Sequence, residues 1–124
     1  MATPLPKQSE LVLVGDLNSA PTEVSPGGGI VPPYQQFIVA HYRDTWVARN
    51  GRAAGPTCCQ DEDLRNGASR LADRIDHVFV VTPPVLVLKA VRIGENVADK
   101  TWSAPGRPAL WPSDHAGVAT RLHF

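Results

Sequence analysis

A chain of 124 residues with 12 basic and 12 acidic side chains carries no formal net charge at pH 7. Broad electrostatic binding of nucleic acid needs a basic surface that displaces counterions, so this composition disfavours it and leaves room only for a small basic groove. The hydrophobic fraction of 43% is enough for the core of one domain. Because 10 glycines and 12 prolines interrupt the chain, we expect one folded domain with long loops.

The N-terminal residues, the apolar runs and the cysteines give little information on the cellular compartment of the protein. The first ten residues, MATPLPKQSE, lack the basic and apolar regions of a signal peptide, and no apolar run reaches the roughly 18 residues of a membrane helix. The two cysteines, Cys58 and Cys59, are adjacent and therefore poorly placed for an ordinary disulfide. We expect buried thiols instead of a bridge or a metal-binding pair, and the compartment stays open.

The first predicted element is residues 11–14, a continuous apolar run typical of a strand buried on both faces. Residues 19–33 are rich in proline, glycine and serine and predict a surface loop. Residues 34–42 have apolar side chains at helical spacing, and Pro32 and Pro33 suit the first turn of that helix. The N-terminal part thus reads as strand, loop and helix.

The middle of the chain has weaker signals. We interpret residues 43–56 as a polar connection, residues 57–60 as a short strand and residues 61–69 as a charged turn.

Three further strands are predicted in the second half of the chain. Residues 74–81 alternate between apolar and polar side chains and are rich in β-branched residues, and residues 85–94 and 116–124 are similar. A long loop, residues 95–115, separates the last two. Four or five strands with one or two helices predict an α/β or α+β fold, a mixed β-sheet with a flanking helix.

Three short polar motifs lie at the boundaries of these strands. GDLN ends the first strand, RIDH begins a middle strand and SDH precedes the last one. If the strands are neighbours, their side chains converge at one sheet edge, where functional residues tend to lie. The motifs supply Asp16, Asn18, Asp76, Asp114 and His115.

These residue types form a coherent chemical set. A carboxylate such as Asp114 is a hard oxygen ligand suited to Mg²⁺ or Mn²⁺. A histidine oriented by a second carboxylate has a fixed tautomer and a stabilised imidazolium. An aspartate beside an asparagine can hold and deprotonate a water. The set suits attack of water on phosphorus, with the metal and fixed donors stabilising the transition-state charge.

Each motif alone has a simpler interpretation. GDLN is typical of a turn closed by an Asx hydrogen bond, RIDH of a strand with a surface salt bridge, and SDH of a loop or cap. The glycines at 27–29 predict a flexible loop, because the lysine and hydroxyl residue of a phosphate-binding loop are missing. The occurrence of all three motifs at strand boundaries is what favours a site.

The stretches LVLVGDLNS, RDTW, RIDHVFV and WPSDHAGVATRL resemble the C-terminal half of the endonuclease/exonuclease/phosphatase superfamily, which is similar to pancreatic deoxyribonuclease in fold. The resemblance covers residues 11–122 and implies half of a four-layer α/β/β/α sandwich and metal-dependent phosphoester hydrolysis. It implies that Asp16 acts on the attacking water or the phosphate, that Asn18 orients it, and that Asp76 sets the tautomer of His115. It also implies that His115 contacts the phosphate or the water and that Asp114 binds the metal, directly or through water.

The resemblance also implies that the chain is partial. Full members carry an N-terminal half with a metal-binding glutamate, and neither Glu10 nor Glu23 stands in that place. We therefore expect a partial domain over residues 1–124, with a missing N-terminal half or a second copy as a partner. Nucleic acids, lipid head groups and small phosphoesters are the substrates that the resemblance implies. The alternatives are a catalytically inactive binding module and an incomplete fragment.

Some residues are placed outside the expected site. Asp44 in RDTW resembles a structural position of the family, and His77 should point to the strand face opposite Asp76. Trp46, Trp102 and Trp111 are expected to pack in the interior, although Trp102 lies in the loop beside the site and could contact substrate.

Overall fold

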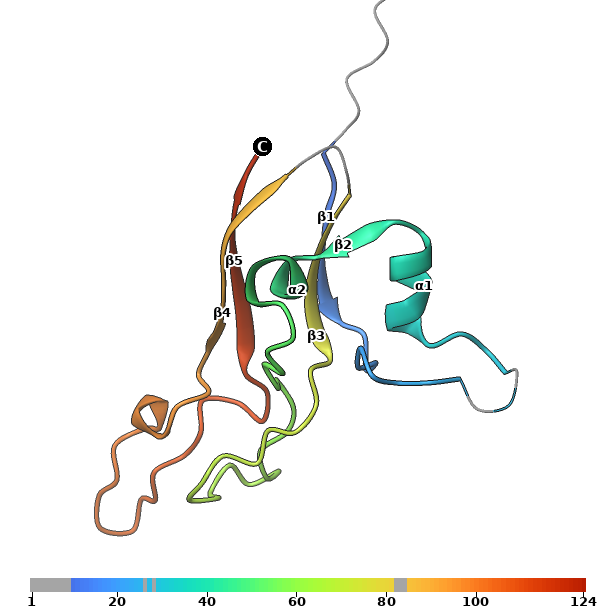
Figure 1. The fold of residues 1–124 in the computed structure, drawn as a ribbon. Helices are drawn as coiled ribbons and strands as arrows, with labels where there is room; N and C mark the ends of the chain where they lie inside the picture. Colours follow the sequence, from blue (N-terminus) through green and yellow to red (C-terminus); the bar gives the residue numbers. More distant parts are fainter. Residues whose placement is uncertain (1–9, 26, 28, 82–84) are drawn as a thin grey trace, which may run out of the picture.

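The computed structural model describes residues 10–25, 27, 29–81 and 85–124 (Figure 1). The expectations for the first nine residues and for the strand end at 82–84 lie outside the described residues. Helices and strands alternate with long loops, which confirms the α+β class. The elements are β1 (Val12–Asp16), α1 (Pro33–Val39), β2 (Tyr42–Asp44), α2 (Thr45–Asn50), β3 (Asp76–Val81), β4 (Leu86–Ile93), the short 3-10 helix η2 (Val97–Asp99) and β5 (Gly117–His123).

The strands form two antiparallel sheets. The first has the order β1-β3-β2, and the second is the pair β4-β5. β3 is the central strand, and its Phe79 and Val80 are 0% and 1% exposed. The apolar, β-branched sequence of β3 is the pattern expected of a strand with neighbours on both sides.

The expectation that the first strand is buried on both faces is wrong. β1 is an edge strand that pairs with β3 on one side, and the side chain of Val14 is 67% exposed. An apolar run predicts a strand. Whether that strand has one or two neighbours in the sheet depends on the rest of the fold.

Helix α1 begins as predicted, with a proline in its first turn, but it ends at Val39, and Tyr42, which was predicted to be helical, begins β2. Tyr34 is buried, and the Phe37 ring stacks on Phe79 of β3 with the ring centroids 5.4 Å apart. The helix therefore covers the face of β3 that carries Phe79.

The interpretation of residues 43–56 as a mere connection is wrong, because they contain most of β2 and all of α2. The Asp44 carboxylate caps α2 by accepting a hydrogen bond from the Trp46 amide at 2.9 Å. Gly51, at φ 60°, ends the helix. A helix of six residues is too short to give a clear apolar period, so its capping residues are the better signal.

Helix α2 lies between the two sheets (Figure 1). Its Trp46 packs against Val87 and Ala90 of β4, with Leu122 of β5 beside them. The Thr45 hydroxyl donates to the Val78 carbonyl at 2.8 Å and lies 3.1 Å from the Thr120 hydroxyl. This helix thus connects the central strand to the β4–β5 pair.

The long loop before β5 is anchored by Trp111, which is 1% exposed. Its indole nitrogen donates to the Asn66 carbonyl at 2.8 Å, and Lys100 donates to the same oxygen and lies over the indole ring. Packing roles are thereby confirmed for Trp46 and Trp111, but the packing role expected for Trp102 is wrong, because its side chain is 96% exposed. None of the helices in the described part of the chain has the length and apolar composition that a membrane crossing requires.

Candidate functional site

The turn after β1 presents Asp16 and Asn18. Asp16 is the last residue of β1, and its Oδ1 accepts a hydrogen bond from the Asn18 amide at 2.7 Å. Asn18 has φ 47°, in the left-handed region that asparagine tolerates better than most residues. The Leu17 amide donates to the Ile75 carbonyl at 2.9 Å, which ties this turn to the residue before β3.

Asp76 and His115 form a direct pair. The imidazole Nδ1 of His115 lies 2.8 Å from Asp76 Oδ2, and both side chains are about one-quarter exposed, at 27% and 22%. Because a carboxylate only accepts hydrogen bonds, Nδ1 carries the proton. In the neutral imidazole the lone pair is then on Nε2, which is the atom left for chemistry.

Residues 57–60 hold the two halves of this pair together. The Thr57 hydroxyl accepts hydrogen bonds from the amides of Ile75 and Asp76, at 3.1 and 3.2 Å. The Thr57 carbonyl accepts from the Ala116 amide at 2.8 Å, and the Gln60 amide donates to the Asp114 carbonyl at 2.7 Å. We call residues 57–60 the brace, because they bind the start of β3 and the start of β5 at once.

The strand predicted at residues 57–60 does not form: within the brace, Cys58 makes only isolated bridges, to Asp73 and His115. Thr57 is 0% exposed and was not singled out by the sequence. A threonine beside a pair of cysteines has no motif of its own, so only the fold identifies its role.

Three predicted site residues meet in one cluster. Asp16, Asp76 and His115 each offer a ligand atom, and these atoms lie within 4.8 Å of one another. Asp16 and Asp76 are partners in the β1–β3 register, so both carboxylates occur on one face. Asn18 lines an adjoining hollow that also contacts Cys58 and Cys59.

Asp114 is not part of this cluster. It is exposed, and its Oδ1 lies 3.2 Å from the hydroxyl of Ser113, which donates to it. Its charge nevertheless acts on the neighbouring histidine. The pKa of His115 is raised above 6.5 mainly by the hydrogen bond to Asp76, with further contributions from the charges of Asp76, Asp114 and Asp16, against the opposing effect of burial.

The expectation of buried thiols is wrong for one of the two cysteines. The sulfur atoms of Cys58 and Cys59 lie side by side. Cys58 is buried, but Cys59 is exposed, and its Sγ lies 3.9 Å from His115 Nε2. The brace therefore brings both sulfur atoms to the edge of the cluster.

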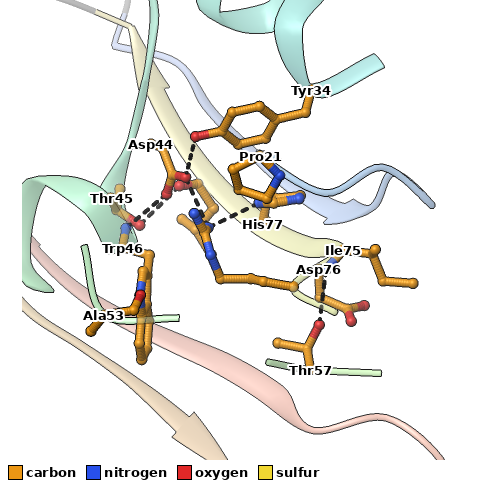
Figure 2. A network of polar contacts seen from close by, with 12 residues as sticks. Pro21, Tyr34, Asp44, Thr45, Trp46, Ala53, Thr57, Ile75, Asp76 and His77 are labelled. Atoms are coloured by element: carbon orange, nitrogen blue, oxygen red, sulfur yellow. Dashed lines mark hydrogen bonds and ion pairs between the residues drawn. The ribbon is translucent and has the colours of Figure 1, made fainter. Parts of the chain in front are cut away.

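The other face of β3 carries a buried polar network (Figure 2). The His77 ring packs against Tyr34, whereas the Asp76 carboxylate contacts His115 on the opposite face, as strand alternation requires. His77 Nδ1 lies 3.1 Å from Arg74 Nη1, and its Nε2 lies 2.9 Å from the Ser19 carbonyl. A guanidinium only donates and a carbonyl only accepts, so His77 is neutral with its proton on Nε2.

The network continues from Arg74 to Asp44. These two side chains form an ion pair at 2.8 Å and are 6% and 2% exposed. The Tyr34 hydroxyl donates to Asp44 at 2.7 Å, and burial, followed by the contact with Asp44, raises the pKa of Tyr34 to about 12. Asp44 thus has a structural place, and His77 fixes the backbone at Ser19, next to the Asn18 turn.

The comparison with family models adds an independent observation. The model described as the Endonuclease/Exonuclease/phosphatase family matches residues 1–115, most of the chain. The chain belongs to the endonuclease/exonuclease/phosphatase family. No curated protein and no solved structure matches the chain in the corresponding comparisons.

Membership of the endonuclease/exonuclease/phosphatase family indicates hydrolysis of phosphoesters, nucleic acids included. Its members generally use divalent metals, and the group formed by Asp16, Asp76 and His115 offers ligands of that kind. The region matched by the family model includes GDLN, RIDH and SDH, with His115 as its last residue.

Proposed function

We propose that this chain is a metal-dependent phosphoester hydrolase in which His115 is the proton-transferring group and Asp76 orients it. The observation that carries the proposal is the 2.8 Å contact between His115 Nδ1 and Asp76 Oδ2. That contact leaves Nε2 free to take a proton from a water molecule, and it stabilises the imidazolium that forms. The raised pKa of His115 favours the same step.

The turn after β1 supplies the remaining groups around the water. The Asp16 carboxylate lies on the same sheet face as Asp76 and can accept a hydrogen bond from the attacking water. The side-chain amide of Asn18 has both donors and an acceptor, which allows it to orient water or a phosphate oxygen. We infer that the Asx turn between Asp16 and Asn18 keeps these side chains at fixed positions.

A divalent ion fits the donor set of the cluster. Asp16 and Asp76 are hard oxygen donors of the type that Mg²⁺ and Mn²⁺ prefer, and opposed carboxylates repel each other until a cation neutralises them. When bound, the ion would neutralise phosphate charge during the reaction. Asp114 is the further carboxylate proposed to hold it, directly or through water.

We also propose that the described domain works as part of a larger unit, with a further segment or a second copy completing it. The exposed apolar side chains of Val12 and Val14 on β1 support this. The substrate proposed is a phosphoester without a requirement for a long basic surface, because the chain has no net charge.

Hydrolysis of bis(p-nitrophenyl) phosphate tests the proposal. The chain is assayed with Mg²⁺, with Mn²⁺ and with EDTA, alongside His115→Asn and the matched control His123→Asn, whose histidine is exposed near the end of β5. We expect metal-dependent turnover that falls about 10²–10⁴-fold in His115→Asn and stays unchanged in His123→Asn. Turnover that survives His115→Asn, or no turnover with either metal, would overturn the proposal and favour an inactive binding module.

A further inference from the structure

A second group of metal-binding atoms shares only His115 with the cluster above. Cys58, Cys59 and His115 each offer one ligand atom, and these atoms lie within 4.8 Å of one another. The shortest relevant approach joins Cys59 Sγ to His115 Nε2, at 3.9 Å. Two donors of one tetrahedral zinc ion lie roughly 3.5–4 Å apart, given Zn–S near 2.3 Å and Zn–N near 2.1 Å.

The orientation of His115 suits this second group better than the first. Its Nδ1 is already committed to Asp76, and Nε2 is the nitrogen that faces Cys59. Histidines that bind zinc commonly donate their other N–H to a carboxylate, which fixes the ring and makes the ligating nitrogen more basic. Asp76 and His115 have that arrangement with Nε2 directed at sulfur.

The brace holds residues 72–73 and residues 114–116 in place on both sides of the sulfur atoms. The Thr57 carbonyl and the Gln60 amide bond to residues on either side of His115, namely Ala116 and Asp114. The Cys58 carbonyl also accepts from the Ala72 amide, at 2.6 Å, and from the Asp73 amide. Because the backbone is already held in this arrangement, metal binding would require little further ordering of the donor atoms.

We propose that Cys58, Cys59 and His115 form a site for a thiophilic divalent ion such as Zn²⁺ when both cysteines are thiols. The zinc ion then displaces two protons, one from each thiol, and takes the neutral Nε2 as its third ligand. A water completes the tetrahedron.

Ligand chemistry separates this site from the carboxylate cluster. Thiolate and imidazole prefer Zn²⁺, whereas Mg²⁺ and Mn²⁺ prefer oxygen donors. Because both sites need His115, a zinc ion on Nε2 removes the nitrogen that the hydrolysis uses. This consequence rests on the proposed function, whereas the metal binding itself does not.

A Co²⁺ titration of the reduced full chain tests the site without any activity assay. The chain is reduced with dithiothreitol, freed of reductant under argon and titrated with Co²⁺, whose bonds to thiolates give a charge-transfer absorption in the near ultraviolet. We expect one equivalent of Co²⁺ to produce the band, equimolar Zn²⁺ to abolish it, and the oxidised chain to give none.

Variants assign the ligands. Cys59→Ser should abolish the two-thiolate band, and His115→Asn should weaken Co²⁺ binding by about tenfold or more, while His123→Asn leaves it unchanged. Asp76→Asn should lower the affinity by about 10–100-fold with the band shape retained. Circular dichroism of each variant establishes that it is folded, and the Cys58→Ser variant provides a second test of the cysteine pair.

Three outcomes would overturn the proposal: no thiolate band in the reduced chain, a band unaffected by His115→Asn, and equal binding by the oxidised chain. Hydrolysis of bis(p-nitrophenyl) phosphate, followed in parallel, keeps the two proposals apart. Turnover without a cobalt band overturns only the zinc site. A cobalt band without turnover supports the zinc site and counts against the hydrolase.

Discussion

Asp16 and Asp76 are direct partners in the antiparallel ladder between β1 and β3. Both carboxylates lie at the same end of the sheet, where strand β1 leads into the Asn18 turn. Two like charges directly opposite each other destabilise a pair of strands, so this arrangement lowers the stability of the fold. In the proposed function, the two acids there provide a binding place for a cation.

The first prediction concerns that opposition. Asp16→Asn removes one of the two charges and should raise the free energy of unfolding of the metal-free chain by about 0.2–1 kcal/mol. The same variant should bind Mn²⁺ more weakly and hydrolyse phosphodiesters more slowly. Urea unfolding in EDTA measures the first effect, and a Mn²⁺ titration measures the second. A variant that is both less stable and equally able to bind Mn²⁺ would contradict this account.

The second prediction concerns the titration of His115. Its pKa is raised, so its pairing with Asp76 stabilises the fold fully below about pH 6.5 and loses that effect as pH rises through the folded pKa. An NMR titration of the imidazole should give a midpoint above 6.5, and Asp76→Asn should move it down. Because the proposed reaction uses neutral Nε2, the pH at which hydrolysis reaches half its maximum should fall in the same variant.

The third prediction concerns His77, whose pKa is lowered mainly by burial. A neutral His77 stabilises the fold above about pH 6.5, and that contribution is lost as pH falls through the folded pKa. Stability should therefore drop between pH 7 and pH 5 in the His115→Asn chain, where the opposing titration of His115 is gone. Urea unfolding at both pH values checks this, and a double variant with His77→Asn should show a smaller drop.

The fourth prediction compares two ion pairs. Asp44→Ala leaves Arg74 buried without its counter-ion and should cost about 3–5 kcal/mol. The matched control is Asp61→Ala, which breaks the exposed pair with Arg70 and should cost less than about 1 kcal/mol. Urea unfolding of both variants measures the difference. Equal losses of unfolding free energy in the two variants would show that the buried pair stabilises the fold no more than the exposed pair does.

The fifth prediction concerns Gly55, which has φ 55° and lies against the Trp46 ring, with no room for a Cβ atom. Gly55→Ala should destabilise the fold by about 1–3 kcal/mol, because the ring must move and the backbone is strained. Gly67→Ala is the control, since open space surrounds that position. The thermal midpoints of the two variants should separate clearly, and a harmless Gly55→Ala would show that the Trp46 ring is free to shift.

The positions of the strands around the site could be predicted from sequence because their side chains alternate or are β-branched. β3, β4 and β5 occur within a few residues of their expected bounds, and the order of GDLN, RIDH and SDH led to the cluster of Asp16, Asp76 and His115. These features depend on local pattern and on one resemblance. Asp114, from the same SDH motif as His115, lies outside the cluster, and Asn18 lines the hollow beside it.

What the sequence could not show depends on contacts between distant segments. The pairing of Arg74 with Asp44 joins residues of β2 and the loop before β3, and no local pattern signals it. Likewise, Thr57 is buried only because two segments cross it. The sequence also could not show that β1 is an edge strand, because an apolar run does not specify the neighbours of a strand.

The brace makes the candidate site dependent on the folding of distant parts of the chain. Asp76 and His115 are 39 residues apart in the chain, and residues 57–60 connect them only after both strands are in place. Closing such loops costs entropy before any contact compensates for it, so these contacts depend on the rest of the fold. A chain with one misplaced strand therefore has no partial version of the site. The cluster therefore depends on the completed fold, and the metal binding proposed for it would serve as an assay for the native state.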